Sequence, residues 1–311
     1  MRLMIDTDAG IDDAQALMLA LGHPDVTVEG ITTISGNVHV DKVISNVCTV
    51  VDIMGKDVPI YRGVPRPFIE VWEPEAPHIH GHDGMGDWAE RPITTRGVEP
   101  MHAVDALLKA VNDAPGEITL VTLAPLTNVA LAQTIDPTFA SKVKEVIVMG
   151  GATFAVGNAP YIAAEWNFYC DPEAAKIVFE RFPHLTLVTW ETTLFNPLPW
   201  SAYDMLIGLP TPRAQAFRGI TYNYRDFASI IPGLNGYLIP DPLAMAVALD
   251  PGVIRESADY HISVELQGKL SRAQTVINYF KGLEDPASKT VTLVTSLHMD
   301  GVIDLYKQAL G

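Results

Sequence analysis

Strand and helix patterns alternate from the start of this chain, and this alternation restricts the fold more than any other feature. Short apolar runs predict strands, and apolar residues three or four positions apart predict a helix between them. Strands joined by single helices pair in parallel, and helices cover both faces of the resulting sheet. Before residue 62 the predicted order is strand, helix, strand, helix, strand, at Leu3–Ile5, Ile11–Leu21, Val26–Ile34, Val43–Met54 and Val58–Tyr61.

The same alternation resumes later and gives way to a different pattern near the C-terminus. Three more strands and two more helices are predicted at Ile118–Leu123, Leu126–Ala132, Val143–Met149, Asp171–Arg181 and Leu185–Thr189. The C-terminal pattern predicts strands and a last helix, at His261–Leu266, Ala273–Asn278, Thr290–Thr295 and Asp300–Leu310. Because the sequence shows no linker or internal repeat, we predict one α/β domain over residues 1–311. Its sheet should be mostly parallel, doubly wound and Rossmann-like, with inserted loops and extra C-terminal strands.

Two stretches interrupt this rhythm. Residues 63–100 hold six prolines, two tryptophans, and three histidines at positions 78, 80 and 82. A loop of this length within a compact domain is usually functional, so we predict a long active-site loop. Whether it closes over a substrate as a lid stays open. Residues 191–240 form a second stretch, rich in aromatic residues, which we predict to be irregular.

The charge balance narrows the choice of partners. Asp and Glu number 37 against 21 Lys and Arg, so the formal charge is −16. Such a chain repels phosphate backbones and anionic lipid surfaces, which argues against a nucleic-acid or membrane partner. The sequence has no apolar run long enough to cross a bilayer, acidic residues near its start where a secretory signal would be apolar, and no CxxC pair. We therefore expect a cytoplasmic protein.

Four aspartates lie close together around the end of the first predicted strand, at Asp6, Asp8, Asp12 and Asp13. No Lys or Arg occurs between Leu3 and Asp41, so no neighbour in the sequence offsets their charge. Crowded carboxylates raise one another's pKa values, and a bound cation relieves this repulsion. Ligands that are all oxygen favour a hard ion, Ca²⁺ or Mg²⁺. The alternative interpretation is that Asp12 caps the following helix while the other aspartates are solvated.

The same residues carry a resemblance to a known family. The run Asp6–Ala14, with the sequence DTDAGIDDA, resembles the DTDxGxDDA signature of the inosine–uridine nucleoside hydrolases. Several motifs in one order make a match specific, whereas a single motif would be weak. The resemblance continues along the whole chain through segments that are similar to family motifs, at Ile31–Asn37, Ile79–Met85, Ala124–Asn128, Val148–Gly151, Gly157–Asn158, Glu165–Asn167, Asp171–Ala175 and the PDPLA run of residues 240–244.

This resemblance implies an enzyme that hydrolyses the N-glycosidic bond of ribonucleosides, releases ribose and a free base, and serves purine or pyrimidine salvage. It implies an oxocarbenium-like transition state and a general base, Asp8, that activates the water. It also implies a tightly held Ca²⁺, with ligands from Asp8, Asp13, Asp241 and the backbone carbonyl of Leu123. The residues that resemble the family's ribose contacts are Asp12, Asn37, Asn158, Glu165 and Asn167. Turn and cap roles remain the alternative for the two asparagines beside glycine and for Asp241 before Pro242.

One position departs from the family pattern. Where well-known members have a His before the last metal-binding Asp, this chain has Pro240, which can neither protonate a leaving base nor stack on it. Two loop histidines, His80 and His82, are candidates for the general acid, and His80 carries the motif match. We predict a base pocket from His80, Trp166 and Tyr222. Stacking by a different tryptophan, or contacts from other residues of the second interrupted stretch, are alternatives, at Trp72, Trp88, Tyr224 and Arg225.

Two other functions stay open from the sequence. Asp-Thr-Asp after a first strand also resembles the nucleophile motif of haloacid-dehalogenase-like phosphatases, in which Asp6 would attack phosphorus with the help of Mg²⁺. Against this, Gly150–Thr153 stands where those enzymes have a further acidic pair. The second alternative is a catalytically weak homologue that only binds a nucleoside or another ribosyl compound. Because members of the nucleoside hydrolase family associate, the resemblance also implies a homodimer or homotetramer that acts on a small-molecule nucleoside.

Overall fold

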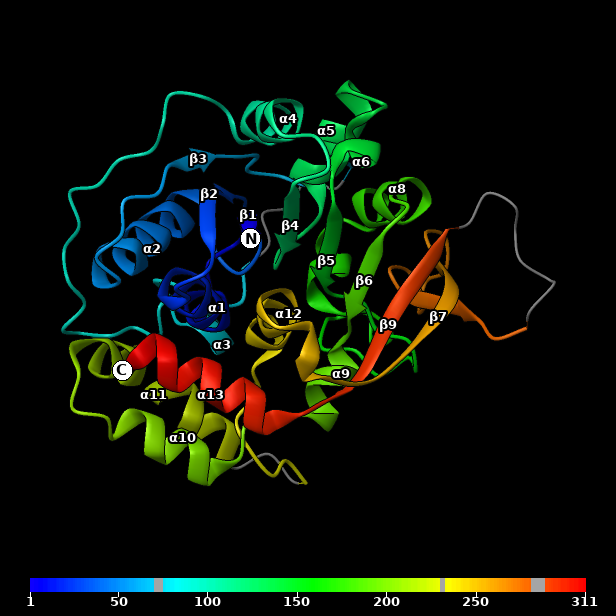
Figure 1. The fold of residues 1–311 in the computed structure, drawn as a ribbon. Helices are drawn as coiled ribbons and strands as arrows, with labels where there is room; N and C mark the ends of the chain where they lie inside the picture. Colours follow the sequence, from blue (N-terminus) through cyan, green and yellow to red (C-terminus); the bar gives the residue numbers. More distant parts are fainter. Residues whose placement is uncertain (70–74, 230–232, 281–288) are drawn as a thin grey trace.

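The computed structural model describes residues 1–69, 75–229, 233–280 and 289–311. Within these residues the strands form one sheet in the order β3-β2-β1-β4-β5-β6-β9-β7-β8 (Figure 1). Neighbouring strands from β3 through β9 are parallel, whereas β7 runs antiparallel to β9 and β8. The strands are β1 Arg2–Thr7, β2 Thr27–Thr33, β3 Ile60–Arg62, β4 Ile118–Thr122, β5 Glu145–Met149, β6 Leu185–Val188, β7 Ile254–Val264, β8 Thr275–Asn278 and β9 Thr290–Leu297.

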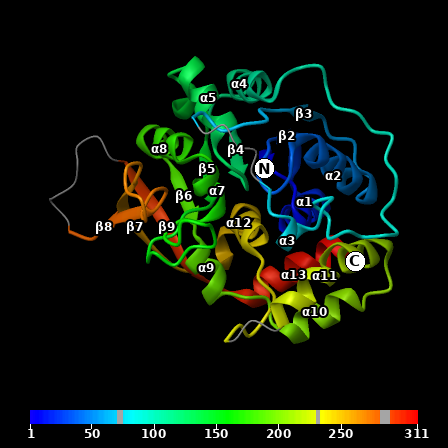
Figure 2. The same ribbon diagram turned by 180° about the vertical axis from the view of Figure 1, so that it is seen from behind.

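Helices cover both faces of the sheet (Figures 1 and 2). Along β1, Leu3 and Ile5 belong to the apolar core on one face, and Met4 belongs to the core on the other. This alternation explains why a continuous apolar run forms a strand that is buried on both sides. The first core contains α1 Ile11–Gly22, α2 Val40–Ile53, α10 Trp200–Ile207, α11 Pro212–Ser229, α12 Pro240–Leu249 and α13 Met299–Leu310. The second contains α4 Ala103–Asp113, α5 Thr127–Ile135, α6 Phe139–Lys142 and α8 Pro172–Arg181.

The strand order creates a crevice at one edge of the sheet. The chain leaves β1 toward β2 and β3 on one side and later adds β4, β5 and β6 on the other. Ligands of doubly wound sheets bind where the direction of winding reverses, outside the carboxyl ends of the strands. In this protein that point lies at the ends of β1 and β4, beside Thr7 and Thr122.

The predicted fold class is confirmed, because the sheet is mostly parallel and antiparallel strands are added at its C-terminal end. The long stretch 63–100 contains one short helix, α3 Pro77–His80, within its described part. Among the described residues, no helix is both long enough and apolar enough to cross a membrane.

The prediction that residues 191–240 are irregular is wrong. This stretch contains α10, α11 and nearly all of α9 Trp190–Phe195. Its aromatic residues pack on one another: the rings of Tyr203 and Tyr237 stack with centroids 5.0 Å apart, and Phe217 lies 5.9 Å from Tyr203. This tertiary packing stabilises helices whose own residues have only moderate helix propensity. Several other boundaries also differ, and the largest shift is that of β7, which begins at Ile254 rather than His261.

Candidate active site and metal centre

A cavity of about 190 Å³ opens at the carboxyl ends of the central strands. Its floor comes from the turn between β1 and α1, and its walls come from α3, the segment around residues 158–167, α9, α11 and the first turn of α12. The described residues that line it are Ile11, Asp12, Asn37, Ala76, His78, Ile79, His80, Leu123, Met149, Asn158, Glu165, Trp166, Asn167, Trp190, Tyr224, Leu238, Pro240 and Asp241. Acidic, amide and aromatic side chains therefore share one small space, and none of these residues is Lys or Arg.

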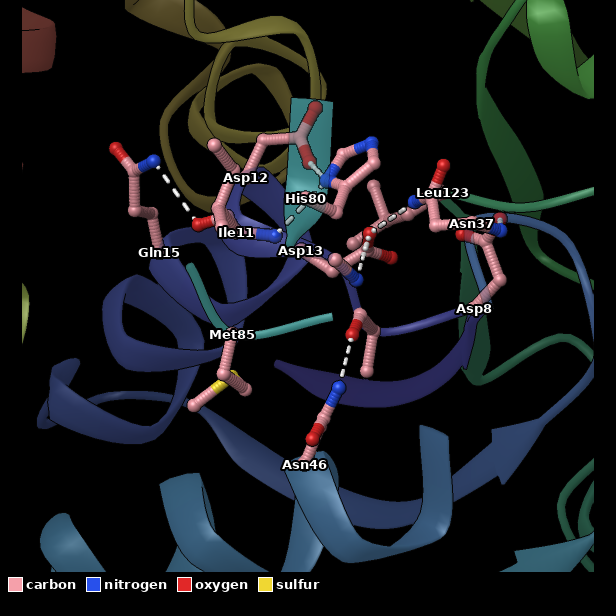
Figure 3. Close-up of polar contacts among 12 residues, drawn as sticks. Asp8, Ile11, Asp12, Asp13, Gln15, Asn37, Asn46, His80, Met85 and Leu123 are labelled. Carbon is pink, nitrogen blue, oxygen red and sulfur yellow. Dashed lines mark hydrogen bonds and ion pairs between the residues drawn. The ribbon is translucent and has the colours of Figure 1, made fainter. Parts of the chain in front are cut away.

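A tight turn brings the aspartates of the first motif together (Figure 3). Gly10 is required in this turn, because a Cβ there would overlap the imidazole of His80 and lie 2.7 Å from Nδ2 of Asn37. Asp13 is held at both oxygens: Oδ1 accepts a hydrogen bond from the Thr7 hydroxyl, and Oδ2 accepts one from the Gly10 N–H at 2.8 Å. The turn is thus shaped by the carboxylates that the sequence singled out.

Asp8 is held from the next strand along the sheet. Its Oδ2 accepts the backbone N–H of Asn37 at 2.7 Å, and the side chain of Asn37 donates to Asp13 at 3.1 Å. Asp8 Oδ1, in contrast, is buried and has no hydrogen-bond partner. A buried carboxylate oxygen without a partner is costly, so this atom indicates a ligand that the polypeptide does not supply.

The carboxylates form one electrostatic cluster. One oxygen from each of Asp12, Asp13 and Asp241 lies within 4.8 Å of the others, an arrangement that could hold a metal ion. Burial and the neighbouring charges raise the pKa of Asp8 and of Asp241 well above the ordinary value. Burial, and for Asp13 also the charge of Asp12, raises the pKa of Asp12 and Asp13 to about 6. Without a cation this cluster would bind protons near neutral pH, whereas a divalent ion would keep it ionised.

Leu123 lies at the same end of the sheet, and its role as a carbonyl ligand stays a prediction. It lines the cavity at the end of β4, and its backbone carbonyl accepts a hydrogen bond from Nδ2 of Asn167 at 3.0 Å. Its N–H donates to the carbonyl of Asp6 at 2.9 Å. A carbonyl oxygen has a second lone pair, so this bond leaves room for a cation ligand. The three carboxylates that lie within 4.8 Å of one another are the type of donor that hard cations prefer, and this group contains Asp12 in place of the predicted ligand Asp8.

Asp6 does not belong to the cavity lining. It is fully buried, and its Oδ1 accepts hydrogen bonds from Oγ1 of Thr32 at 2.6 Å and Nδ2 of Asn128 at 2.8 Å. Burial raises the pKa of its carboxyl to about 7. Asp8 and Asp13 also lie outside the lining, but both are hydrogen-bonded to the lining residue Asn37. The carboxylate of Asp6 is bonded to residues outside the lining, which argues against the phosphatase interpretation, in which Asp6 attacks phosphorus. Its bonds instead tie together the ends of β1 and β2 and the start of α5.

All five predicted ribose contacts line the cavity: Asp12, Asn37, Asn158, Glu165 and Asn167. Some of them also have the cap and turn roles given as the alternative. Glu165 caps α7 (Trp166–Cys170), because its carboxylate accepts N–H groups from Asn167, Phe168 and Gly151. The Oδ1 of Asn158 accepts the Trp166 N–H at 2.8 Å. These bonds fix the side chains at the cavity wall.

The two loop histidines differ sharply. His80 lines the cavity and is 5% exposed, and its Nδ1 accepts the N–H of Ile11 at 3.2 Å. Burial lowers the pKa of His80 to about 4, so the ring is neutral at pH 7 and carries its proton on Nε2. His82 is exposed and lies outside the cavity lining, where its backbone N–H donates to Asp87.

The structure also sorts the candidates for the base pocket. Trp166 and Tyr224 line the cavity, whereas Tyr222 is 46% exposed and lines a separate hollow with Trp88. Arg225 is directed toward α10, where it lies 3.5 Å from the Asp204 carboxylate. Trp72 lies outside the described residues.

Trp190 lines the cavity and was missed by the sequence analysis. It begins α9 directly after β6, so the rule that sites gather at the carboxyl ends of parallel strands offered a signal for it.

Comparison with known proteins places this site in a family. The family model for inosine-uridine preferring nucleoside hydrolase matches residues 3–304. Uridine nucleosidase 1 of Arabidopsis thaliana is 35% identical, over 86% of this chain and 79% of its own. The inosine-uridine preferring nucleoside hydrolase of Crithidia fasciculata is 34% identical, over 89% of this chain and 88% of its own.

Solved structures agree with these relatives. A plant nucleoside hydrolase superposes with a TM-score of 0.92 at 32% identity and covers 99% of this chain and 98% of its own. The purine-preferring ribonucleoside hydrolase from Gardnerella vaginalis gives 0.90 at 28% identity, over 100% and 98%. The fold is thus that of enzymes that hydrolyse N-glycosyl bonds. The chain belongs to the inosine–uridine preferring nucleoside hydrolase family, and its reaction is the hydrolysis of ribonucleosides at the N-glycosidic bond.

Proposed function

We propose that this enzyme is a Ca²⁺-dependent ribonucleoside hydrolase in which Asp8 is the general base. The observation that carries the proposal is the buried carboxylate cluster, in which Asp8 Oδ1 has no hydrogen-bond partner and the cavity lining contains no Lys or Arg. Asp8, Asp13, Asp241 and the carbonyl of Leu123 would hold the ion. Ca²⁺ accepts several oxygen ligands in flexible geometry, which suits this uneven donor set better than the strict octahedron of Mg²⁺.

The chemistry requires a nucleophilic water and support for a cationic sugar. Bound Ca²⁺ would supply charge that orients a water and the ribose hydroxyls and lowers the pKa of that water. Asp8 accepts a proton from the water as its oxygen bonds to C1′. The C1′–N bond breaks with its electron pair going to the base, and the cluster of carboxylates favours the positive charge that develops on the sugar.

Asp12, Asn37, Asn158, Glu165 and Asn167 are proposed to orient the ribose. Each lines the cavity, and amide and carboxylate groups match hydroxyls that both donate and accept hydrogen bonds. The caps and turn bonds described above make these side chains rigid before substrate arrives. Such preorganisation lowers the cost of reaching a productive geometry.

Because Pro240 cannot donate a proton, the leaving base must be stabilised by other residues of the cavity. His80 is held neutral with its proton on Nε2, so it can donate a hydrogen bond to a ring nitrogen or carbonyl of the departing base. Tyr224 lies in the same cavity and offers a hydroxyl, and Trp166 and Trp190 offer aromatic faces. Because Tyr224 lines the cavity and Tyr222 does not, Tyr224 replaces Tyr222 in this proposal.

The test is the release of free base and reducing sugar from inosine, adenosine, guanosine, uridine, cytidine and a chromogenic ribosyl phenolate. A phenolate leaves with little protonation, so this substrate reports on the carboxylate cluster and water alone. We expect phenolate cleavage together with cleavage of at least one natural nucleoside. A protein that binds these compounds and cleaves none of them would instead be a ribosyl-binding homologue.

The sequence also suggests a biological role, a location and an assembly for this enzyme. We propose a role in nucleoside salvage in the cytoplasm and a homodimer or homotetramer in solution. Light scattering after size-exclusion chromatography measures the subunit number directly.

A further inference from the structure

The turn that carries His80 is a closed unit with its own bracing. Oδ1 of Asp83 accepts the N–H groups of Met85 and Asp87, and Oδ1 of Asp87 accepts those of His82 and Asp83. The N–H of Gly86 donates to the backbone carbonyl of His80 at 2.8 Å. A displacement of Gly86 is therefore passed directly to the backbone of His80.

One helix, α11, holds this turn from outside. Its Asn223 donates a side-chain hydrogen bond to the carbonyl of Gly86. The backbone of Gly86 itself approaches the carbonyl of Ile220 so closely that a Cβ at residue 86 would overlap it. At Gly219, one helical turn before Asn223, a Cβ would overlap the ring of Trp88. Both glycines thus mark surfaces that fit together without space for a methyl group.

The same helix carries Tyr224 into the active-site cavity. Ile220 and Tyr224 are four positions apart and both buried, while Gly219 and Asn223 form the adjacent row that meets the 80–88 turn. The helix therefore contacts two parts of the site. One row of its residues packs against the turn that carries His80, and the next row places Tyr224 in the cavity lining.

We propose that Asn223 and Trp88 are positioning residues, which clamp the 80–88 turn onto α11 and so fix His80 relative to Tyr224 around the leaving base. The inference rests on the proposed function, because it assigns these two residues to departure of the base. It explains why Trp88, one of the aromatic residues of the long loop, lies against a helix and not in the cavity.

Loss of the clamp should leave the fold intact, because the turn is also held on its other side. Asn46 of α2 donates to the carbonyls of Asp83 and Ala9, and Arg91 donates to Ser45 and Thr49 of the same helix. Variants at α11 therefore change the spacing between the turn and α11 more than they change the stability of the chain.

The experiment compares a natural nucleoside with the ribosyl phenolate in the full-length enzyme. The variants are Asn223→Ala, Asn223→Asp, which keeps the shape but loses the donor, Trp88→Ala and Gly219→Ala. Ser229→Ala is the matched control, because this exposed residue of α11 lies outside the hollow beside Trp88 and its hydroxyl donates to the carbonyl of Asp226 in the same helix. We expect kcat/KM for the nucleoside that the wild type cleaves fastest to fall about tenfold or more, while the value for the phenolate stays within about twofold.

Gly219→Ala is the sharpest variant, because alanine normally favours a helix. Its added methyl group should nevertheless lower nucleoside cleavage by displacing Trp88, and the double variant Trp88→Ala/Gly219→Ala should be no worse than Trp88→Ala alone.

The clamp is overturned if Asn223→Ala and Gly219→Ala leave the nucleoside-to-phenolate ratio within about twofold of wild type, whether both rates fall together or neither falls. Thermal melting of each variant identifies a simple loss of stability. Failure of the proposed function is a separate result, seen as absence of cleavage of every substrate by the wild type.

Discussion

The buried carboxylates that are proposed to act in the reaction also lower the stability of the folded protein. Asp6, Asp8, Asp13 and Asp241 are at most 2% exposed, and removing an ion from water without a partner costs several kcal/mol. Asp6 and Asp13 recover part of this cost through hydrogen bonds with hydroxyl, amide or backbone donors. Asp6 and Asp8 each keep one oxygen without a partner, but of these two only Asp8 is bonded to Asn37, which lines the cavity. The unpartnered oxygen of Asp8 is available for the reaction, but its burial lowers the stability of the folded protein.

Asp8→Asn separates these two effects. The amide keeps an acceptor for the N–H of Asn37 but cannot take a proton from water, so phenolate cleavage should fall by about 10³-fold. Melting temperature in the presence of a chelator should hold or rise, because a buried charge is removed from the cluster. Asp57→Asn, in which a fully exposed surface carboxylate is changed, is the control and should keep its activity. An Asp8→Asn enzyme with wild-type turnover would contradict the role of Asp8 as general base.

Glu165 predicts a pH dependence of stability. Burial raises its pKa from the ordinary 4.5 to about 7, so the folded state keeps a proton that the unfolded chain has released between these values. The stability contributed by this proton is complete below about pH 4.5 and is lost as the pH rises through 7.

Urea unfolding at pH 5 and pH 8 measures this effect. The unfolding free energy of the wild type should fall between pH 5 and pH 8. In Glu165→Gln this fall should be smaller by ~2–3 kcal/mol. Glu256→Gln, at an exposed position in β7, should leave the slope unchanged. Equal slopes in wild type and Glu165→Gln would show that this carboxyl is ionised at neutral pH in the folded protein.

Individual residues were predictable where their type and spacing limited their chemistry. The crowded aspartates and the absence of nearby Lys or Arg predicted a cluster, and the structure brings Asp12, Asp13 and Asp241 together. The choice between Tyr222 and Tyr224 was not predictable, because residues two positions apart in a helix point to nearly opposite sides and the helix itself was not foreseen. Nor does sequence spacing show that Asp6 is bonded to Asn128, outside the cavity that Asp12 lines.

At the scale of elements, the turns at strand ends align the site. The turn after β2 passes so close to Asp8 that a Cβ at Gly36 would overlap its carboxylate. The elements around β1 were predictable, since apolar strands and amphipathic helices alternate there. The helices α10 and α11 were not, because they are stabilised by aromatic packing between segments and not by a strong local pattern.

Gly36→Ala tests this alignment. The added methyl group must displace Asp8 or the turn, so phenolate cleavage should fall by about 10²-fold or more. Gly97→Ala is the matched control, because a Cβ there meets no atom within 4 Å. Activity near the wild-type level in Gly36→Ala would mean that the position of Asp8 against this turn is unimportant for the reaction.

At the scale of the whole molecule, the fold places a cavity at its switch point and closes it with elements from the second half of the chain. The first turn of α12 brings Asp241 from far along the sequence to the aspartates that follow β1. All residues of α12 are buried, so the position of Asp241 is set by the core as a whole. The global architecture was predictable from the alternation of strands and helices. The proximity of Asp241 to the aspartates after β1 was implied only by the family resemblance.

In the proposed mechanism, hydrolysis requires a cation held by the aspartate cluster. The most direct measurement is the rate of ribosyl phenolate cleavage by chelator-treated enzyme as Ca²⁺ is added back, with wild type and Asp13→Asn compared. We expect the treated wild type to be inactive, Ca²⁺ to restore its activity in a saturable way, and Asp13→Asn to need a higher Ca²⁺ concentration. Full activity of the wild type after verified removal of metal would show that the bound cation is not required.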